Sequence, residues 1–414
     1  MTVNRVAFIL YKYPLGVSSM IINSIRLFAQ RNYRVDIYIN RQSYEEAPIT
    51  FTEPGIRIII FDDHGMSLLL RCYRFVIRRT GDYFLLLAKK LTVTTCLLLF
   101  YPDAYRFLKW LNRRLKKHEY TYIMPVEYMS LLCLAPVQQK GTILYYNMEL
   151  LDWSKNNPLY GKNKRMLKEL EYNMIRTIPQ VVTPSPLRSD LFSEINTFDR
   201  ESVYSLPVAP IGDPVIDKSR YFRDMFNIPD DHRIVLYSGN FQRWFQCLEI
   251  IKSVPHWPAK TVLVMHTWNR SALKTAYFRD MKRLAEGLPV YLSASYIPYN
   301  DLPEALSSAD IGLAFYEALD DNFTEILFSS NKIGEYLKAG LGVICSDFSS
   351  LKQFVEDNGI GMAVPVHEIP KAVKKTVERI DIVRKQSLRC YHEQIRFENY
   401  FNTFHDKLGD RHGA

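Results

Sequence analysis

A strand, loop, helix, strand pattern that occurs twice is the feature that most constrains how this chain folds. The first copy has a β-rich run at 5–10, a loop containing proline and glycine, a helical pattern at 20–30 and a second β-rich run at 34–40. The pattern restarts at 233–241, where the run RIVLYSGNF leads into a helical stretch and the strand pattern TVLVMH. Because strands that alternate with helices are joined by crossovers, the repeat predicts parallel sheets of the α/β class.

Two domains are expected, each a Rossmann-like, doubly wound sheet, because 414 residues exceed the size at which one core usually stops growing. Further strand patterns follow in both halves, and a segment rich in proline, glycine and aspartate lies between them at 205–231. We therefore expect a first domain at 1–205, a second at 206–384 and a final helix at 385–414 that packs back on the first domain. Ligands of such sheets bind at the carboxyl ends of the strands, here facing a central cleft.

Positive charge is concentrated in the first half of the chain. The formal net charge is +9, and the first 200 residues hold 28 Lys and Arg against 17 Asp and Glu. Cations alternate with apolar and aromatic residues throughout 71–117. Such a stretch can lie on an anionic membrane, each nearby cation adding about 1 kcal/mol, or it can be a solvated helical face. Nucleic acid is not the expected partner, because no nucleic-acid-binding signature accompanies the charge.

Several patterns indicate a cytoplasmic protein that contacts the inner face of the cell membrane only peripherally. The six cysteines lie far apart without metal or redox spacing, as reduced core residues would. The apolar run after Arg5 is too short for a signal peptide. The most apolar window, 83–101, has Lys89 and Lys90 at its centre, and each would cost about 2.5 to 3.5 kcal/mol in a bilayer. A membrane-spanning helix is therefore not expected.

The segment SSNKIGEYLKAG at 329–340 carries the strongest functional signal. Its serines predict a helix start, where backbone N–H groups and the positive end of the helix dipole suit a phosphate. Lys332 adds a point charge, and Glu335 lies three residues on, on the same side of the helix. A carboxylate can accept two hydrogen bonds from a vicinal diol, as in ribose. The alternative is a surface Lys and Glu that form a weak ion pair.

The order of these motifs resembles that of GT-B glycosyltransferases, in particular the large retaining family 4. The segment 308–347, which reads SADIGLAFYEALDDNFTEILFSSNKIGEYLKAGLGVICSD, is similar to the donor-binding segment of the branch with an Asn-Lys-x-x-Glu-Tyr signature. It follows YYNMEL and YSGNF in the family's order. The resemblance implies transfer of a sugar from a UDP- or GDP-linked donor to a saccharide acceptor. Given the basic stretch, we expect a lipid-linked or membrane-associated acceptor in cell-surface polysaccharide or glycan assembly.

The resemblance also implies roles for individual residues. Glu335 is expected to bind the ribose, while Lys332 and Arg243 stabilise the diphosphate. The remaining donor contacts are expected from loops and the helix start, at Gly16, Gly239, Asn240, Asn322, Ser330 and Asn331. Either glycine could instead be an ordinary turn residue. Glu149, at the end of a predicted strand, could orient the acceptor hydroxyl or act as general base; alternatively it caps the following turn.

The sequence departs from the family pattern at two places. Leu327 stands where many members have a first glutamate, so the sugar contacts could come from Asn322, Thr324 or Glu325. Met148 stands where relatives often have histidine. Retention of configuration is still expected, because in this family the leaving phosphate is thought to assist the acceptor.

No metal site and no cofactor beyond the donor are expected, because the pair Asp320-Asp321 lacks the Asp-x-Asp spacing of metal-dependent transferases. Two rival functions remain open. A nucleotide-sugar epimerase would use the same scaffold but needs acid and base groups around the sugar. A non-catalytic scaffold or nucleotide-sugar sensor is favoured by the two departures.

Overall fold

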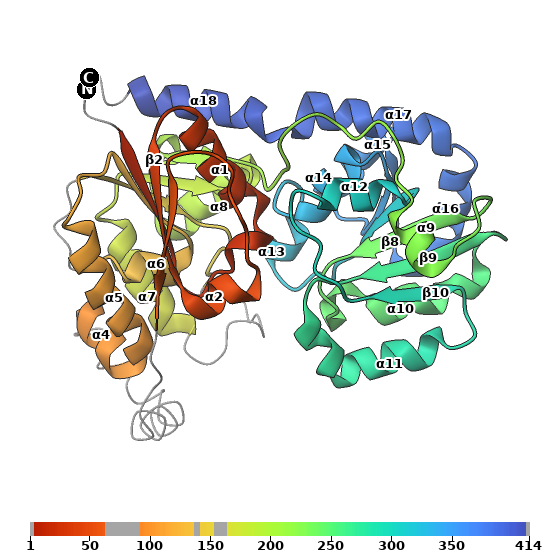
Figure 1. Ribbon diagram of the computed structural model, residues 1–414, viewed down its shortest axis with the longest axis horizontal. Coiled ribbons are helices and arrows are strands. Elements are labelled where there is room, and N and C mark those ends of the chain that lie inside the picture. The colour runs from red at the N-terminus through yellow and green to blue at the C-terminus, as the bar shows by residue number, and fades with distance from the viewer. Residues whose placement is uncertain (1–3, 63–91, 136–140, 153–163, 411–414) are drawn as a thin grey trace. The chain divides into compact units, whose positions relative to one another are not determined.

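The computed structural model describes residues 4–62, 92–135, 141–152 and 164–410 (Figure 1). The chain divides into two compact units. One comprises Met1–Leu206 together with Phe401–Ala414, and the other comprises Pro207–Tyr400. Each unit is built on its own parallel sheet, as the repeated pattern predicts.

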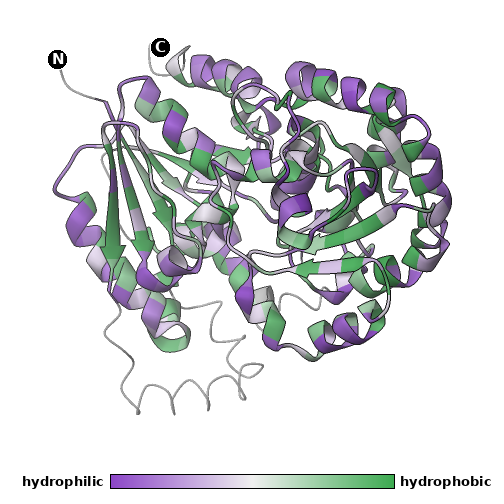
Figure 2. Cartoon of the chain, turned by 45° about the vertical axis from the view of Figure 1, so that its right-hand side comes forward, coloured by the Kyte–Doolittle hydropathy of each residue, from purple (hydrophilic) through white to green (hydrophobic). Residues whose placement is uncertain are grey.

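The first unit contains a seven-stranded sheet in the order β3-β2-β1-β4-β5-β6-β7. All of its paired strands run parallel. The strands are β1 (Arg5–Leu10), β2 (Arg34–Asn40), β3 (Ile56–Phe61), β4 (Tyr122–Pro125), β5 (Thr142–Tyr146), β6 (Gln180–Thr183) and β7 (Val203–Ser205). β1 is apolar after Arg5, and both β1 and β2 are buried along almost their whole length, because helices cover both faces of such a sheet (Figure 2).

The described helices of the first unit follow the strands in alternation. They are α1 (Ser19–Gln30), α2 (Arg41–Glu46), α4 (Val93–Phe100), α5 (Pro102–Leu115), α6 (Glu127–Leu132), α7 (Lys164–Ile175) and α8 (Pro186–Asn196). The last helix of the chain, α18 (Phe397–Asp410), enters this unit at Phe401. The Phe401 ring lies 5.1 Å from that of Phe28, and the Tyr122 hydroxyl donates to the Leu408 carbonyl at 3.3 Å.

The second unit contains a six-stranded parallel sheet in the order β10-β9-β8-β11-β12-β13. Its strands are β8 (Arg233–Ser238), β9 (Thr261–His266), β10 (Val290–Ser293), β11 (Ile311–Ala314), β12 (Gly342–Cys345) and β13 (Gly361–Ala363). The order reverses between β8 and β11, the place where open α/β sheets bind ligands beyond their carboxyl ends. The predicted doubly wound architecture is thus confirmed.

Helices cover both faces of the second sheet (Figure 1). They are α9 (Tyr221–Phe226), α10 (Cys247–Ser253), α11 (Ala276–Ala285), α12 (Leu302–Ser307), α13 (Asp321–Thr324), α14 (Asn331–Lys338), α15 (Ser349–Asp357), α16 (Ile369–Val377) and α17 (Ile380–Cys390). Helix α10 packs with α11 and α16, whereas α12 packs with α9 and α14. The buried side of α14 holds Ile333, Tyr336 and Leu337 in the core.

The final helix differs from the sequence expectation. Instead of one helix, the structure has α17, a π-helical turn at Tyr391–Ile395, and α18. Arg396 between them is extended, with ψ of 122°. The Tyr391 hydroxyl contacts the carbonyls of Pro210 and Gly212 at 3.2 and 2.8 Å, which anchors this turn to the segment entering the second unit. A helical break at a π turn is a common way to redirect a helix.

Candidate functional site

The carboxyl ends of β8 and β11 are joined to α14 by Tyr336. Its ring fills the space above Gly312, where an added Cβ would lie 2.3 Å from a ring carbon. The Tyr336 hydroxyl accepts from the Ser238 N–H at 2.9 Å and donates to the Leu313 carbonyl at 3.2 Å. Helix α14 is therefore held directly beside the turn that follows β8.

The start of α14 is built by its N-cap. The Ser330 hydroxyl oxygen accepts from the Lys332 N–H at 3.3 Å and lies 2.7 Å from the Tyr316 hydroxyl. Phe328, just before the cap, has φ of 62°, a conformation that costs a non-glycine residue of order 1 to 3 kcal/mol. Asn331 opens the helix. The strained residue and the cap together fix where the N-terminal N–H groups of α14 lie.

The Lys332 ammonium lies among three aromatic rings. Its Nζ is 4.3 Å from the ring centroid of Phe245, 4.8 Å from that of Tyr316 and 5.4 Å from that of Tyr237. No ion pair joins it to a carboxylate within the described ranges. Burial lowers the pKa of Lys332 to about 8.

Glu335 is a buried carboxyl group, only 3% exposed. Neither of its oxygens has a hydrogen-bond partner among the described residues. Burial raises the pKa of Glu335 to about 7, although the Lys338 ammonium opposes the shift. An unpartnered buried carboxyl is costly and therefore uncommon, so this one indicates a ligand that donates hydrogen bonds.

The turn after β8 requires glycine at position 239. Gly239 has φ of 155°, and its N–H donates to the His266 carbonyl at 2.9 Å. A Cβ there would lie 2.7 Å from Cε of Lys332, so the backbone and the lysine stem are in direct contact. The next residue, Asn240, has a buried Oδ1 without a partner in the described parts of the chain. Arg243 follows in a 3-10 turn, Arg243–Phe245, and is exposed.

Three residues proposed for the sugar lie on and around the short helix α13. The Asp320 carboxylate caps it by accepting from the Asn322 N–H at 2.9 Å. Asn322 is buried, whereas Thr324 and Glu325 are half-buried. Of the sequence-predicted residues, Gly239, Asn240, Arg243, Asn322, Ser330, Asn331, Lys332 and Glu335 all belong to the second unit.

Comparison with known proteins identifies the fold. Residues 261–403 match the family model described as glucosyltransferase 3-like, C-terminal domain. The structure superposes on a sucrose-phosphate synthase from Thermosynechococcus elongatus with a TM-score of 0.69 and 14% identity, covering 99% of this chain and 100% of that one. The chain has the GT-B glycosyltransferase fold. No curated protein sequence matches it significantly.

Two further structures with the GT-B fold are similar over nearly their whole length. HepE of Anabaena in complex with UDP-glucose gives a TM-score of 0.68 at 10% identity, with 98% of this chain and 99% of that chain covered. WaaG, a glycosyltransferase involved in lipopolysaccharide biosynthesis, gives 0.63 at 14% identity, with 95% and 96% covered. At these identities the likeness concerns the fold.

The first unit of this GT-B chain holds the two other predicted residues. Gly16 lies in a 3-10 turn, and a Cβ there would be 2.6 Å from the Ala47 carbonyl oxygen, which also accepts from the Gly16 N–H at 3.1 Å. Close packing thus explains this glycine without a ligand. Glu149 is exposed just beyond β5, at the carboxyl end of the first sheet.

Glu127 is a candidate that sequence reasoning missed. It follows β4 with φ of 66°, strained for a non-glycine residue. One carboxylate oxygen accepts from the N–H groups of Met148 and Glu149, at 2.8 and 3.1 Å. Burial, and then the charge of Glu149, raise the pKa of Glu127 well above its usual range. The available sequence signal was a glutamate directly after the strand pattern YIMPV at 122–126.

A buried polar network fixes the loop that carries Glu149. The Asn147 side-chain amide donates to the Tyr145 hydroxyl at 3.0 Å and to the Glu149 carbonyl at 3.3 Å. The Tyr145 hydroxyl in turn donates to Glu171 at 2.7 Å, and Lys168 pairs with Glu171 at 2.9 Å. Since each of these four side chains has a partner, the network orders the loop that carries Glu149.

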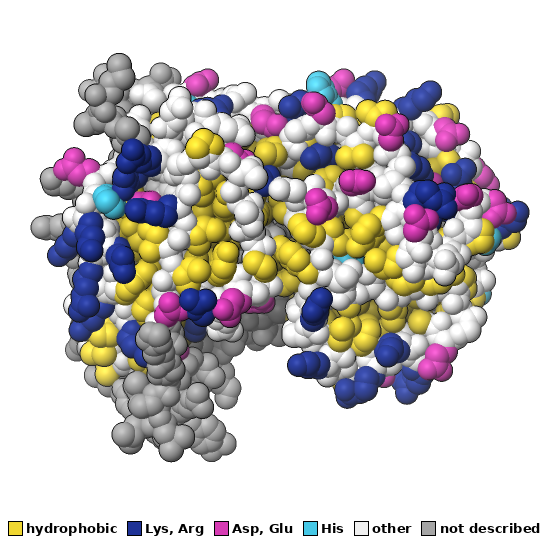
Figure 3. Space-filling view, in the orientation of Figure 1, with side chains coloured by type: hydrophobic (Ala, Val, Ile, Leu, Met, Phe, Trp, Pro, Cys, Tyr) yellow, Lys and Arg dark blue, Asp and Glu magenta, His cyan; other side chains and the backbone are white. Residues whose placement is uncertain are grey.

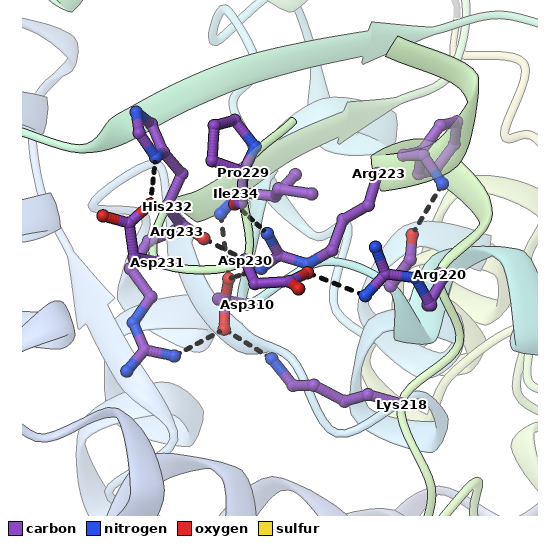
Figure 4. Close-up of polar contacts among 12 residues, drawn as sticks. Lys218, Arg220, Arg223, Pro229, Asp230, Asp231, His232, Arg233, Ile234 and Asp310 are labelled. Carbon is purple, nitrogen blue, oxygen red and sulfur yellow. Dashed lines mark hydrogen bonds and ion pairs between the residues drawn. The ribbon is translucent and has the colours of Figure 1, made fainter. Parts of the chain in front are cut away.

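Asp310, the first of four aspartates in the 308–347 segment, has a structural role at the amino ends of the strands of the second sheet. It is 2% exposed, precedes β11, and accepts from the Ile234 N–H at 2.8 Å. Lys218 and Arg233 both pair with it, and Figure 4 shows their side chains converging on its carboxylate. This cluster lies at the amino ends of the strands, away from the proposed ligand-binding edge.

The described ranges hold neither a cluster of metal ligands nor a membrane-spanning helix. No three His, Cys, Asp or Glu side chains there come together as metal ligands would. In the same residues, no helix combines the length and apolar character that a membrane span needs. Five cysteines are buried and unbonded to one another; Cys72 lies outside the described residues.

Proposed function

We propose that the protein is a glycosyltransferase that moves a sugar from a nucleotide-diphosphate sugar to a saccharide acceptor. The observation that carries the proposal is the buried, unpartnered carboxyl of Glu335 on the same helix as Lys332, three residues after it. Ribose supplies the two hydroxyl donors that Glu335 lacks, and the diphosphate supplies the negative charge that Lys332 and the start of α14 attract. Asn240 and Asn331 add polar contacts around the same ligand.

The donor is proposed to be UDP-linked. Structures with the same fold are complexed with UDP-glucose and with UDP-2-fluoro glucose, which supports uracil over guanine. Asn322, Thr324 and Glu325, next to the start of α14 in sequence, are proposed to contact the sugar in place of the glutamate that Leu327 replaces. Family 4 membership is proposed on the motif order.

In the proposed reaction the acceptor oxygen bonds to the anomeric carbon as the bond from that carbon to the diphosphate oxygen breaks. Lys332, Arg243 and the helix dipole stabilise the charge that develops on the leaving diphosphate, the role that a divalent ion has in other transferases. The acceptor proton passes to the leaving diphosphate oxygen on the same face of the sugar, so configuration is retained. Glu149 orients the acceptor hydroxyl and Glu127 fixes the loop that carries Glu149.

The acceptor is proposed to be lipid-linked, in cell-surface polysaccharide or glycan assembly, with the protein on the cytoplasmic face of the membrane. Support comes from α5, where Lys109, Arg113 and Arg114 are exposed, and from Leu98 on α4, which is 46% exposed. Lysine and arginine side chains gather along this edge of the first unit (Figure 3). The apolar side of α5 packs into the core, so its cations would supply the membrane contact. Residues 71–91 of the proposed basic segment lie outside the described residues.

Sedimentation with anionic liposomes tests the membrane proposal. Changing Lys109, Arg113 and Arg114 to Glu should abolish binding, because each cation contributes about 1 kcal/mol near such a surface. The matched control changes three exposed lysines of the second unit, Lys374, Lys375 and Lys385, to Glu. Equal binding by the wild type and the α5 variant would refute the membrane contact.

Isothermal titration with UDP-glucose, followed by a turnover assay, tests the enzymatic proposal. The wild type should bind UDP-glucose, and Glu335→Ala should weaken binding by about tenfold or more, whereas the exposed Glu378→Ala should not. Binding without transfer to any acceptor would favour a non-catalytic sensor. Interconversion of the donor sugar without an acceptor would favour an epimerase.

A further inference from the structure

The three rings around Lys332 come from separate parts of the second unit. Tyr237 is in β8, Phe245 ends the 3-10 turn before α10, and Tyr316 follows β11. We refer to Tyr237, Phe245 and Tyr316 together as the aromatic cage. Because residues so distant in sequence meet around one ammonium group, the arrangement is a product of the tertiary fold.

The rings of the cage are themselves held in place. The Tyr237 hydroxyl donates to the Asn240 carbonyl at 2.6 Å, and the Tyr316 hydroxyl lies 2.7 Å from that of Ser330. The rings of Phe245 and Tyr316 meet edge to face, with centroids 5.8 Å apart. The hydroxyl groups of Tyr237 and Tyr316 therefore bond to Asn240 and Ser330 rather than to Lys332.

The cage attracts the ammonium without neutralising it. Ring faces carry a negative quadrupole but no net charge, and such contacts contribute about 0.5 to 2 kcal/mol. A carboxylate in the same place would pair with Lys332 and compete with an incoming diphosphate. Glu335, three residues later, is no such partner: it makes no ion pair with Lys332 within the described residues, and Cys247, the nearby thiol, has its pKa raised to about 11 and so is neutral.

We propose that the aromatic cage is a positioning device that holds the Lys332 ammonium, charged and beside Gly239, ready for the diphosphate of the donor. The inference rests on the proposed function and gives a role to three residues for which the sequence motifs implied none. The three rings are positioning residues that act through Lys332.

A double-mutant cycle on UDP affinity tests the cage. Phe245→Leu removes the nearest ring but keeps an apolar side chain; it should weaken UDP binding by about three- to tenfold. Lys332→Met should weaken binding further, and adding Phe245→Leu to Lys332→Met should then change the affinity less than about twofold. The matched control is Phe278→Leu, which removes a ring that Lys282 contacts at 5.8 Å on α11.

Equal costs of Phe245→Leu with and without Lys332 would overturn the proposal, because the ring would then act independently of the lysine. A second pair of variants keeps the test valid if Phe245→Leu fails to fold. Tyr316→Leu should weaken UDP binding more than Tyr316→Phe, which keeps the ring. The reverse order would also overturn it.

Nuclear magnetic resonance separates this proposal from the proposed function. The Lys332 ε-protons of the wild type should show a ring-current shift that Phe245→Leu reduces. If the Lys332 ε-protons show the ring-current shift but the protein binds no nucleotide, both the diphosphate role and the proposed function are refuted. Nucleotide binding with an unshifted Lys332 would refute the cage alone.

Discussion

The backbone of Gly239 and the side chain of Lys332 are in contact: a Cβ on residue 239 would lie 2.7 Å from Cε and 3.2 Å from Nζ of the lysine. Because Gly239 has no side chain, the stem of Lys332 can lie directly against its backbone. Position 239 and position 332 form one structural unit, although they are almost a hundred residues apart in sequence.

Gly239→Ala should weaken UDP-glucose binding by about tenfold, because the methyl group displaces Lys332. Backbone strain alone is controlled by Gly287→Ala, since Gly287 also has positive φ, 75°, but no atom within 4 Å of an added Cβ. Titration calorimetry on both variants measures the difference. Equal affinities of the two variants would contradict the contact's role.

Donor affinity should depend on pH in a bell shape. The Glu335 carboxylate accepts from both ribose hydroxyls only when ionised, so affinity rises as pH passes about 7. Lys332 loses its charge above about 8, so affinity falls again. Dissociation constants of UDP-glucose from about pH 5 to about pH 10 should show both limbs. Glu335→Gln should remove the acidic limb and keep the alkaline one; retention of the acidic limb would exclude Glu335 as its source.

Glu335 should also make stability depend on pH. Its pKa in the folded protein is raised above its unfolded value, so the stability it contributes is complete below about pH 4 and is lost as pH rises through about 7. Glutamine does not titrate. The free energy of unfolding of Glu335→Gln should therefore rise by about 2 to 3 kcal/mol relative to that of the wild type between about pH 5 and about pH 8. Urea unfolding at the two pH values measures this change, with Glu378→Gln as the exposed control. A constant difference would contradict the raised pKa.

Glu127→Ala should lower the rate of transfer by about ten- to a hundredfold while leaving UDP affinity intact. The Met148 and Glu149 N–H groups lose their shared acceptor, but the residues proposed to bind the nucleotide all belong to the second unit. Comparison of kcat with the UDP dissociation constant tests this, and Glu194→Ala, an exposed change in the same unit, is the control. A parallel loss of UDP binding would show a wider structural effect.

Much of the fold follows from local patterns. The runs at 5–10 and 34–40 are long and rich in β-branched and aromatic residues, so β1 and β2 match them residue for residue. By contrast, β7 and β13 have three residues each, too few for a periodic signal. The break at Arg396 depends on Tyr391 reaching carbonyl groups some 180 residues earlier, which no local pattern reports.

The sequence could group candidate residues only where they share one element. Lys332 and Glu335 are three residues apart on a helix, so their common side can be read from the sequence. The aromatic cage and Glu127 could not be found this way. The cage is assembled from three separate segments, and the importance of Glu127 lies in its backbone angle and in hydrogen bonds to residues about twenty positions later.

The hydroxyl of Tyr336, which joins the Ser238 N–H to the Leu313 carbonyl, ties the turn after β8 to the interior of the second unit. Since both bonds are centred on a fully buried ring, the Ser238 amide can exchange its hydrogen with solvent only when that interior opens. Local opening of the turn after β8 is therefore suppressed. Substitutions that loosen the core around Tyr336 would weaken ligand binding and fold stability together.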